Sequence, residues 1–262
     1  MTPEQIDEVW SLLDRAALVA IARRGPEPVF ATVSGAHLYG FASPDSDVDL
    51  RGVILLSARE LLGLSRANET ITLSEKTPDL DLGWVAHDLR KFARLMTGHN
   101  GYVLEQLYSP LVVITSPEHD ELRELGKGCV TRGLFRHYQG FAHGRRQRLV
   151  EPDPTVKHLL YAYRVYLSGI AALESGVIDS NVLCLNERFR LSEIDALVER
   201  KRGGAEAMRL QAGEVEAHAR KLDALEERLI AAHRRSSLPE EPTTRDALED
   251  LVVRVRLQRA LA

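Results

Sequence analysis

The sequence has few of the features that mark secreted or membrane proteins. It has only two cysteines, Cys129 and Cys184, without CxxC spacing, so we expect buried small hydrophobic residues in a reducing compartment, not a disulfide or a zinc site. The N-terminus lacks a basic segment followed by an apolar run, and no stretch approaches the roughly 20 apolar residues that span a bilayer. These absences predict a cytoplasmic protein without a membrane segment.

The sequence also lacks a large excess of charge of one sign. Its net charge of -4 excludes a strongly basic nucleic-acid-binding domain but leaves room for a local basic cleft. With 44% hydrophobic and 27% charged residues, it has the composition of an ordinary globular protein. We find no internal repeat and no low-complexity stretch. Its 262 residues suffice for one large domain or two small ones.

The two halves of the chain differ in periodicity. After a capping box at Thr2 to Gln5 and a helical run from Val9 to Ile21, the first half carries strand signals, and the second half carries only helical ones. The predicted strands cover 28–34, 48–55, 69–73 and 80–86. The predicted helices that follow the opening run cover 59–62, 88–96, 141–149, 156–173, 192–202, 204–234 and 243–261. We therefore expect two domains, 1–125 and 126–262, the second of them helical.

The segment Asp47-Val48-Asp49-Leu50 is the first chemical signal. Side chains alternate between the faces of a strand, so Asp47 and Asp49 point to one side while Val48 and Leu50 point into the core. Two carboxylates at this spacing can bind or bridge hard divalent cations, which prefer oxygen ligands. Phosphoryl transfer uses such ions to neutralise the triphosphate and to polarise the attacking and leaving oxygens.

A turn of small residues precedes these carboxylates. Ser34-Gly35-Ala36 ends the strand before them. A glycine at a strand end lets the backbone N–H groups approach a phosphate, and a nearby hydroxyl such as that of Ser43 can add a donor. His37 lies in the same turn; it can hydrogen-bond a phosphate or simply pack beside Tyr39.

The whole segment GAHLYGFASPDSDVDLRGV resembles the signature of the DNA polymerase beta-type nucleotidyltransferase superfamily. That signature is a Gly-Ser turn followed, after a helix, by a strand bearing Asp-x-Asp. More narrowly, the segment is similar to the predicted bacterial nucleotidyltransferases of the RNA-repair-associated, ligase-linked branch. The resemblance covers roughly residues 30–175 and is sharpest at this motif.

The resemblance implies an α+β fold, with a mixed β-sheet flanked by helices and a C-terminal helical domain. It also implies transfer of a nucleoside monophosphate from an NTP with release of pyrophosphate, using two Mg²⁺ or Mn²⁺ ions. Asp47 and Asp49 would bind the metal ions. The third carboxylate of the superfamily, a ligand or base, is assigned to Asp81, with Asp79 as second choice.

Other residues are candidate nucleotide contacts. The resemblance places Gly35 and its neighbours, Ser34, Ala36 and His37, at the phosphates. In the superfamily a serine follows this glycine, whereas here Ala36 does, so the hydroxyl is expected from Ser34 or Ser43.

Basic residues of the helical half complete the candidate set. Lys157 and Arg164, seven residues apart, share a helix face and can hold the triphosphate or simply be exposed. Arg145, Arg146 and Arg148 form a dense basic cluster in the sequence. They can contact an RNA backbone or provide the positive charge favoured at a helix C-terminus.

We therefore expect a metal-dependent nucleotidyltransferase acting on an acceptor hydroxyl. An RNA end is favoured by the resemblance alone, with a protein side chain or a small hydroxyl compound as alternatives. Two other readings stay open: a nucleotide-binding or regulatory module that has lost its chemistry, supported by Ala36, and a helical interaction protein.

Overall fold

A computed structural model describes residues 1–76, 81–204, 208–211 and 213–261 of the chain. The chain forms two compact units. The first comprises Met1–Gly35, Asp47–Cys129 and Pro242–Ala262, and the second comprises Ala36–Ser46 and Val130–Glu241. These units differ from the continuous ranges 1–125 and 126–262 because segments distant in the sequence pack together. The division into domains 1–125 and 126–262 stays a prediction.

The first unit is built on a mixed β-sheet. In the described part of the chain, its strands run in the order β3-β4-β2-β1-β5, with β2 and β4 parallel and the other neighbours antiparallel. The strands are β1 (Glu27–Ser34), β2 (Val48–Leu55), β3 (Thr70–Lys76), β4 (Asp81–Asp88) and β5 (Val112–Ile114). The predicted α+β class with a mixed sheet flanked by helices is therefore confirmed.

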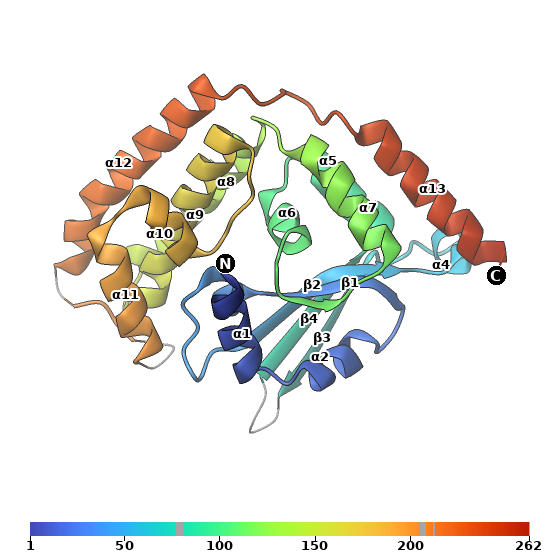
Figure 1. Ribbon diagram of the computed structural model, residues 1–262, viewed down its shortest axis with the longest axis horizontal. Helices are drawn as coiled ribbons and strands as arrows, with labels where there is room; N and C mark the ends of the chain where they lie inside the picture. The colour runs from blue at the N-terminus through green and yellow to red at the C-terminus, as the bar shows by residue number, and fades with distance from the viewer. Residues whose placement is uncertain (77–80, 205–207, 212, 262) are drawn as a thin grey trace. The chain divides into compact units, whose positions relative to one another are not determined.

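Helices cover the sheet face that carries Phe30, Thr32 and Arg51. Phe30 packs against Phe92 of α5 (Leu89–Thr97) and stacks on His119 of α7 (Pro117–Gly126). The Thr32 hydroxyl donates to the Gln106 carbonyl of α6 (Gly101–Leu107) at 2.9 Å. These three helices lie on one side of the strands in Figure 1, and α2 (Arg15–Ala22) lies on the other. A short helix, α4 (Ala58–Leu62), follows β2.

The N-terminal helical run is interrupted. The capping box at Thr2 is present and starts α1 (Pro3–Leu12). The prediction of one helix through Val9 to Ile21 is wrong, because the Asp14 side chain accepts a hydrogen bond from the Ala17 N–H at 3.0 Å and begins α2. An Asp at this position satisfies an N–H that a new helix leaves without a partner, so it favours a second helix start over continuation.

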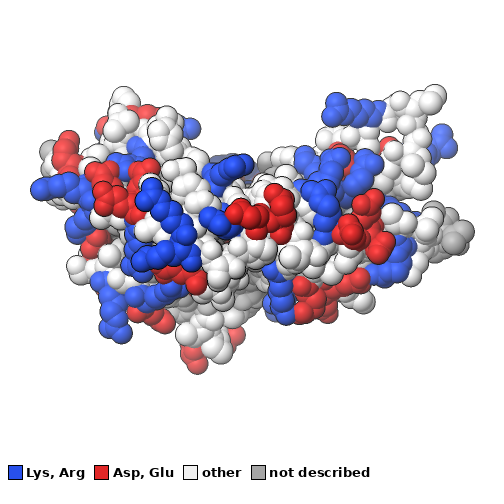
Figure 2. All heavy atoms as spheres, turned by 90° about the horizontal axis from the view of Figure 1, so that it is seen from above, with Lys and Arg blue, Asp and Glu red and all other residues white. Residues whose placement is uncertain are grey.

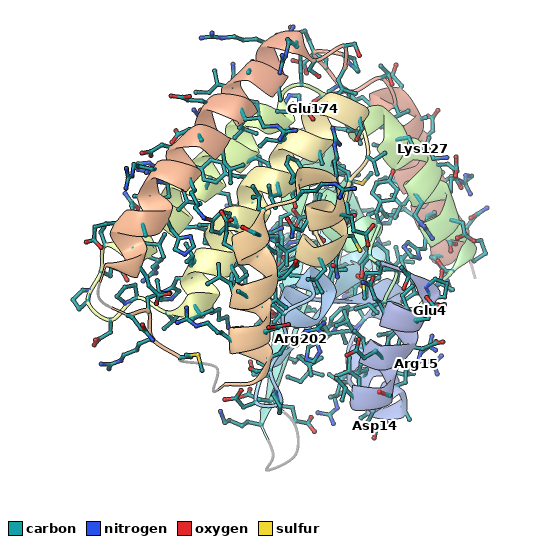
Figure 3. The ribbon with its side chains drawn as sticks, turned by 60° about the vertical axis from the view of Figure 1, so that its left-hand side comes forward. Glu4, Asp14, Arg15, Lys127, Glu174 and Arg202 are labelled. Atoms are coloured by element: carbon teal, nitrogen blue, oxygen red, sulfur yellow. The ribbon has the colours of Figure 1, made fainter. Side chains whose placement is uncertain are left out.

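The second unit is helical and centred on α9 (Val156–Ser175), which packs against α8, α10, α11 and α12. Figure 3 shows this packing, with Glu174 near the end of α9 and Arg202 at the end of α11. Apart from α9, its helices are α3 (Gly35–Tyr39), α8 (Leu134–Leu149), α10 (Val182–Phe189), α11 (Ser192–Arg202) and α12 (Glu214–Arg235). Gly169 permits the close approach of α8, because an added Cβ would lie 2.7 Å from Cβ of Tyr138.

One helix of this unit starts later than predicted. The prediction of a helix from residue 204 is wrong at its start, since α12 begins at Glu214 after Gly213 in a left-handed conformation. Residues 205–207 and 212 of that predicted range lie outside the described residues. Among the described helices, none is both long enough and apolar enough to cross a bilayer.

The last helix, α13 (Arg245–Leu261), belongs to the first unit and is tied to the sheet by a buried ion pair. Arg256 binds the carboxylate of Asp88 and donates to the Leu56 carbonyl at 2.7 Å. Asp88 is fully buried. It also accepts from the N–H groups of Arg90, the second residue of α5, and of Leu56. One carboxylate therefore holds α13, the start of α5 and the end of β2.

The Arg256→Met variant is expected to lower the free energy of unfolding by about 3 kcal/mol, because it leaves the Asp88 charge buried without its cation. Arg254→Met is the matched control, since Arg254 and its partner Glu121 have side chains 46% and 42% exposed and such pairs contribute at most about 1 kcal/mol. Urea unfolding of both variants measures the difference. Equal effects would show that the buried pair contributes nothing specific.

Candidate active site

The two aspartates of the sequence motif lie at the start of β2. Asp47 is exposed and precedes the strand, and Asp49 is its second residue. Val48 and Leu50 are 5% and 0% exposed, while Asp49 and Arg51 lie on the opposite face and are partly buried. The alternation expected of a strand therefore places Asp49 on the face opposite to Val48 and Leu50.

Arg51 holds the carboxylate of Asp49. Its guanidinium donates to Oδ1 of Asp49 at 2.5 Å, to the Tyr102 hydroxyl at 3.1 Å and to the carbonyls of Leu50 and Gly83 at 2.8 and 3.0 Å. Burial opposes the charged form, but Tyr102 and Asp49 outweigh it and raise the pKa of Arg51. A fixed cation thus sets the orientation of this carboxylate.

The end of β1 lies beside Asp49. Ser34, the last residue of β1, is the register partner of Asp49. Gly35 follows with φ of +62°, and a Cβ added there would lie 2.9 Å from both Cβ and Cγ of Asp49. Only glycine fits this position without displacing the carboxylate, because a side chain would meet both the unfavourable φ and Asp49.

The two serines considered as hydroxyl donors differ in their surroundings. Ser34 is fully buried, and its hydroxyl makes no hydrogen bond to any residue that the structure describes. Ser43 is 4% exposed; its hydroxyl donates to Asp45 at 2.7 Å and accepts from the ammonium group of Lys201 at 2.5 Å. Lys201, fully buried on α11, did not stand out in the sequence, since a lysine in a charged helix usually faces solvent.

The residues between the turn and the aspartates belong to the second unit. Ala36 and His37 are buried at 2% and 6% exposure. The Asn181 side chain donates to the Leu38 carbonyl at 3.0 Å. Gly40 has φ of +87°, and a Cβ added to it would lie 2.9 Å from the Asn181 side chain. Asn181 thus holds the C-terminal end of α3 within this unit.

The predicted third carboxylate, Asp81, begins β4. It precedes Leu82, which is the partner of Val48 in the parallel ladder between β2 and β4. Asp81 therefore lies on β4, beside the segment that leads into β2. Its side chain is 52% exposed and bonds to Lys76 at 2.5 Å. Asp79 lies outside the described residues. Within the described ranges, no group of three or more Asp, Glu, His or Cys side chains is placed to hold a metal ion.

The predicted basic contacts lie in the second unit on α8 and α9. Arg164 is 1% exposed, and its guanidinium lies 4.1 Å from the ring centroid of Tyr39, whereas Lys157 is partly exposed, 6.0 Å from the ring of Tyr161.

The three clustered arginines have different partners. Arg146 pairs with Asp223 and Glu226 of α12, and Arg148 pairs with Glu151. Arg145 instead lies over the rings of Phe141 and Tyr161. On the face shown in Figure 2, cations and carboxylates are interspersed, and the described side chains there form no extended surface of one sign.

Comparison with known proteins agrees with this architecture. A sequence model of the RNA repair pathway DNA polymerase beta family matches residues 14–254. The chain belongs to this family. Membership confirms the resemblance seen in the motif of residues 34–52.

Two similar proteins are described as uncharacterized. A protein of Methanocaldococcus jannaschii is 34% identical over 159 residues, which cover 59% of this chain and 63% of that protein. The protein YcgL of Bacillus subtilis is 29% identical over 194 residues, covering 70% of this chain and 72% of its own length. The match thus spans less than two thirds of the archaeal protein.

Proposed function

We propose that this member of the RNA repair pathway DNA polymerase beta family is a metal-dependent nucleotidyltransferase. It would move a nucleoside monophosphate from an NTP to the hydroxyl of an RNA end and release pyrophosphate. One observation supports this proposal most: Asp47 immediately precedes β2, and Asp49, the second residue of that strand, is held by Arg51 beside Gly35.

The residues present fit a hard divalent cation. Carboxylate oxygens are the protein ligands that Mg²⁺ and Mn²⁺ prefer, and Mg²⁺ in phosphoryl transfer commonly uses one or two carboxylates plus substrate phosphates. Asp47 and Asp49 would hold the ions, two being expected for this chemistry. When bound, the ions supply neutralisation of the triphosphate charge and polarisation of the reacting oxygens.

The other residues receive roles by their positions. In the reaction, the acceptor hydroxyl oxygen bonds to the α-phosphorus, and the bond to the β-phosphate oxygen breaks. We assign acceptance of the hydroxyl proton to Asp81, on the strand next to β2. Ser34 and Gly35 would lie at the phosphates. Contacts of Ala36, His37, Ser43, Lys157 and Arg164 with the nucleotide stay predictions.

The test is incubation with each α-labelled NTP, with Mg²⁺ or Mn²⁺, in the presence of total RNA, total protein or small hydroxyl compounds. Label in the RNA fraction together with released pyrophosphate is the expected result. Label in the protein or small-molecule fraction would show that the acceptor is a protein or a small hydroxyl compound instead of RNA. NTP binding by calorimetry without pyrophosphate release under any condition would contradict the proposal and favour a binding module.

Arg51 is expected to act through Asp49. Residues that orient a metal ligand typically contribute 10- to 100-fold to metal affinity or activity. The Arg51→Met variant should therefore raise the Mg²⁺ concentration at half-maximal transfer about tenfold or more, and calorimetric Mn²⁺ titration of the free protein should show the same loss. Arg24→Met, which removes an exposed arginine paired with Glu75, is the control. An unchanged Mg²⁺ requirement in Arg51→Met would contradict this role.

A further inference from the structure

Rings and cations alternate along the packed pair α8 and α9 in the second unit. His137, Phe141 and Arg145 recur every fourth residue on α8, and Lys157 and Tyr161 are four apart on α9, so each set follows one helix face. All five side chains are partly exposed. We call these five residues the cation–aromatic stripe.

Contacts within the stripe place its groups side by side. The guanidinium of Arg145 lies 4.9 Å from the ring centroid of Phe141 and 4.7 Å from that of Tyr161. Lys157 is 6.0 Å from the Tyr161 centroid, and His137 stacks on Phe141 at 5.6 Å. One arginine therefore joins the rings of the two helices by cation–π contacts.

The charge of Arg145 is not compensated in the described part of the chain. Its neighbours Arg146 and Arg148 pair with carboxylates, but no carboxylate among the described residues pairs with Arg145. Burial, together with the charges of Arg164 and Arg148, lowers the pKa of Arg145. An arginine in such surroundings gains from an anionic ligand, because a phosphate would supply the missing counter-charge.

We propose that the cation–aromatic stripe binds single-stranded RNA, with bases stacking on Phe141 and Tyr161 and Arg145 contacting a backbone phosphate. Stacking platforms interleaved with cations are the general means of holding unpaired nucleic acid. His137 and Arg145 are about 12 Å apart along the helix axis. This length suits an extended stretch of RNA better than a single nucleotide. As the binding site for the acceptor, the stripe rests on the function proposed above.

His137 contributes an aromatic ring to the cation–aromatic stripe and no positive charge. Burial, with the nearby Arg164, lowers its pKa to about 4. The imidazole is therefore neutral at pH 7, and its stacking on Phe141 extends the flat surface along α8. The positive charge that the argument uses comes from Arg145 and Lys157.

Equilibrium binding of a fluorescein-labelled single-stranded RNA of mixed sequence, followed by anisotropy without NTP or metal, tests the proposal. Arg145→Gln should weaken binding about tenfold and reduce the salt dependence by about 0.7 in the log–log slope, as expected for one lost phosphate contact. Arg188→Gln removes the same charge from α10, from a side chain 43% exposed and paired with Glu174, and should change binding less than twofold. Equal losses in both variants would overturn the proposal in favour of non-specific attraction.

A ring variant separates stacking from charge. Phe141→Leu, checked for an unchanged melting temperature, should weaken binding about tenfold while leaving the salt slope unchanged. An RNA affinity in this variant equal to that of the unchanged protein would contradict base stacking. Titration with a fluorescent NTP analogue tests whether the stripe binds the nucleotide instead of RNA. If Arg145→Gln weakens only NTP binding, the stripe binds the triphosphate and the proposal fails.

The two proposals fail separately. Because RNA binding is measured without turnover, Asp47→Asn with Asp49→Asn should keep full RNA affinity. Binding that depends on Arg145, in a protein that transfers no nucleotide, would refute the transferase and leave the stripe standing. Transfer to RNA that is insensitive to Arg145→Gln and Phe141→Leu would do the reverse.

Discussion

Asp49→Asn is expected to lower the rate of nucleotide transfer about 10³-fold, a loss of about 4 kcal/mol of transition-state stabilisation. Asparagine has nearly the same shape, and its amide oxygen can still accept from Arg51, so the fold and the local hydrogen bonds should persist. What disappears is the negative charge that binds the cation. Asp47→Asn is expected to act in the same direction, because its exposed carboxylate immediately precedes β2, two residues from Asp49.

Single-turnover transfer with saturating NTP measures this effect, and Mg²⁺ titration shows whether excess metal restores the rate. Asp250→Asn is the control, since Asp250 is exposed on α13. Asp47→Asn and Asp250→Asn should unfold within about 0.5 kcal/mol of the unchanged protein, as surface substitutions usually do. A rate in Asp49→Asn above a tenth of normal would rule out Asp49 as a metal ligand.

Much of the fold is predictable from local periodicity. The strand predicted over 48–55 is β2 as observed, and the helix predicted over 192–202 is α11. Elements with few residues or weak patterns were missed: β5 has 3 residues, and α6, α7 and α10 have 7, 10 and 8. In such short elements, the caps and the tertiary packing decide the structure, and sequence periodicity has too few turns to show.

The candidate site, like the fold, is predictable from the sequence only in part. Strand alternation predicts that Asp47 and Asp49 share a face, and it also places Arg51 on that face, although its ion pair with Asp49 was not predicted. Lys201 bonds to Ser43 across 158 positions of sequence, and no local pattern predicts a contact over that separation. The spatial partners of the motif therefore come from tertiary packing.

Gly35→Ala is expected to lower both stability and the transfer rate, because the added Cβ meets Asp49 as well as the positive φ of +62°. A left-handed conformation costs an ordinary residue about 1–2 kcal/mol. Displacing the carboxylate adds to this cost and moves a metal ligand, and a misplacement of about 1 Å at an active site can cost about 10²-fold in rate. Transfer should therefore fall at least about 10²-fold.

Gly213→Ala separates the two contributions. Gly213 has φ of +81°, and an added Cβ there would meet nothing within 4 Å, so this variant reports the backbone cost alone. It should lower stability by about 1–2 kcal/mol and leave transfer unchanged, whereas Gly35→Ala should lose both stability and Mn²⁺ affinity. Should Gly35→Ala keep normal Mn²⁺ binding and normal transfer, the approach of the β1 turn to Asp49 would be irrelevant to the metal. The proposed site would then rest on the two aspartates and Arg51 alone.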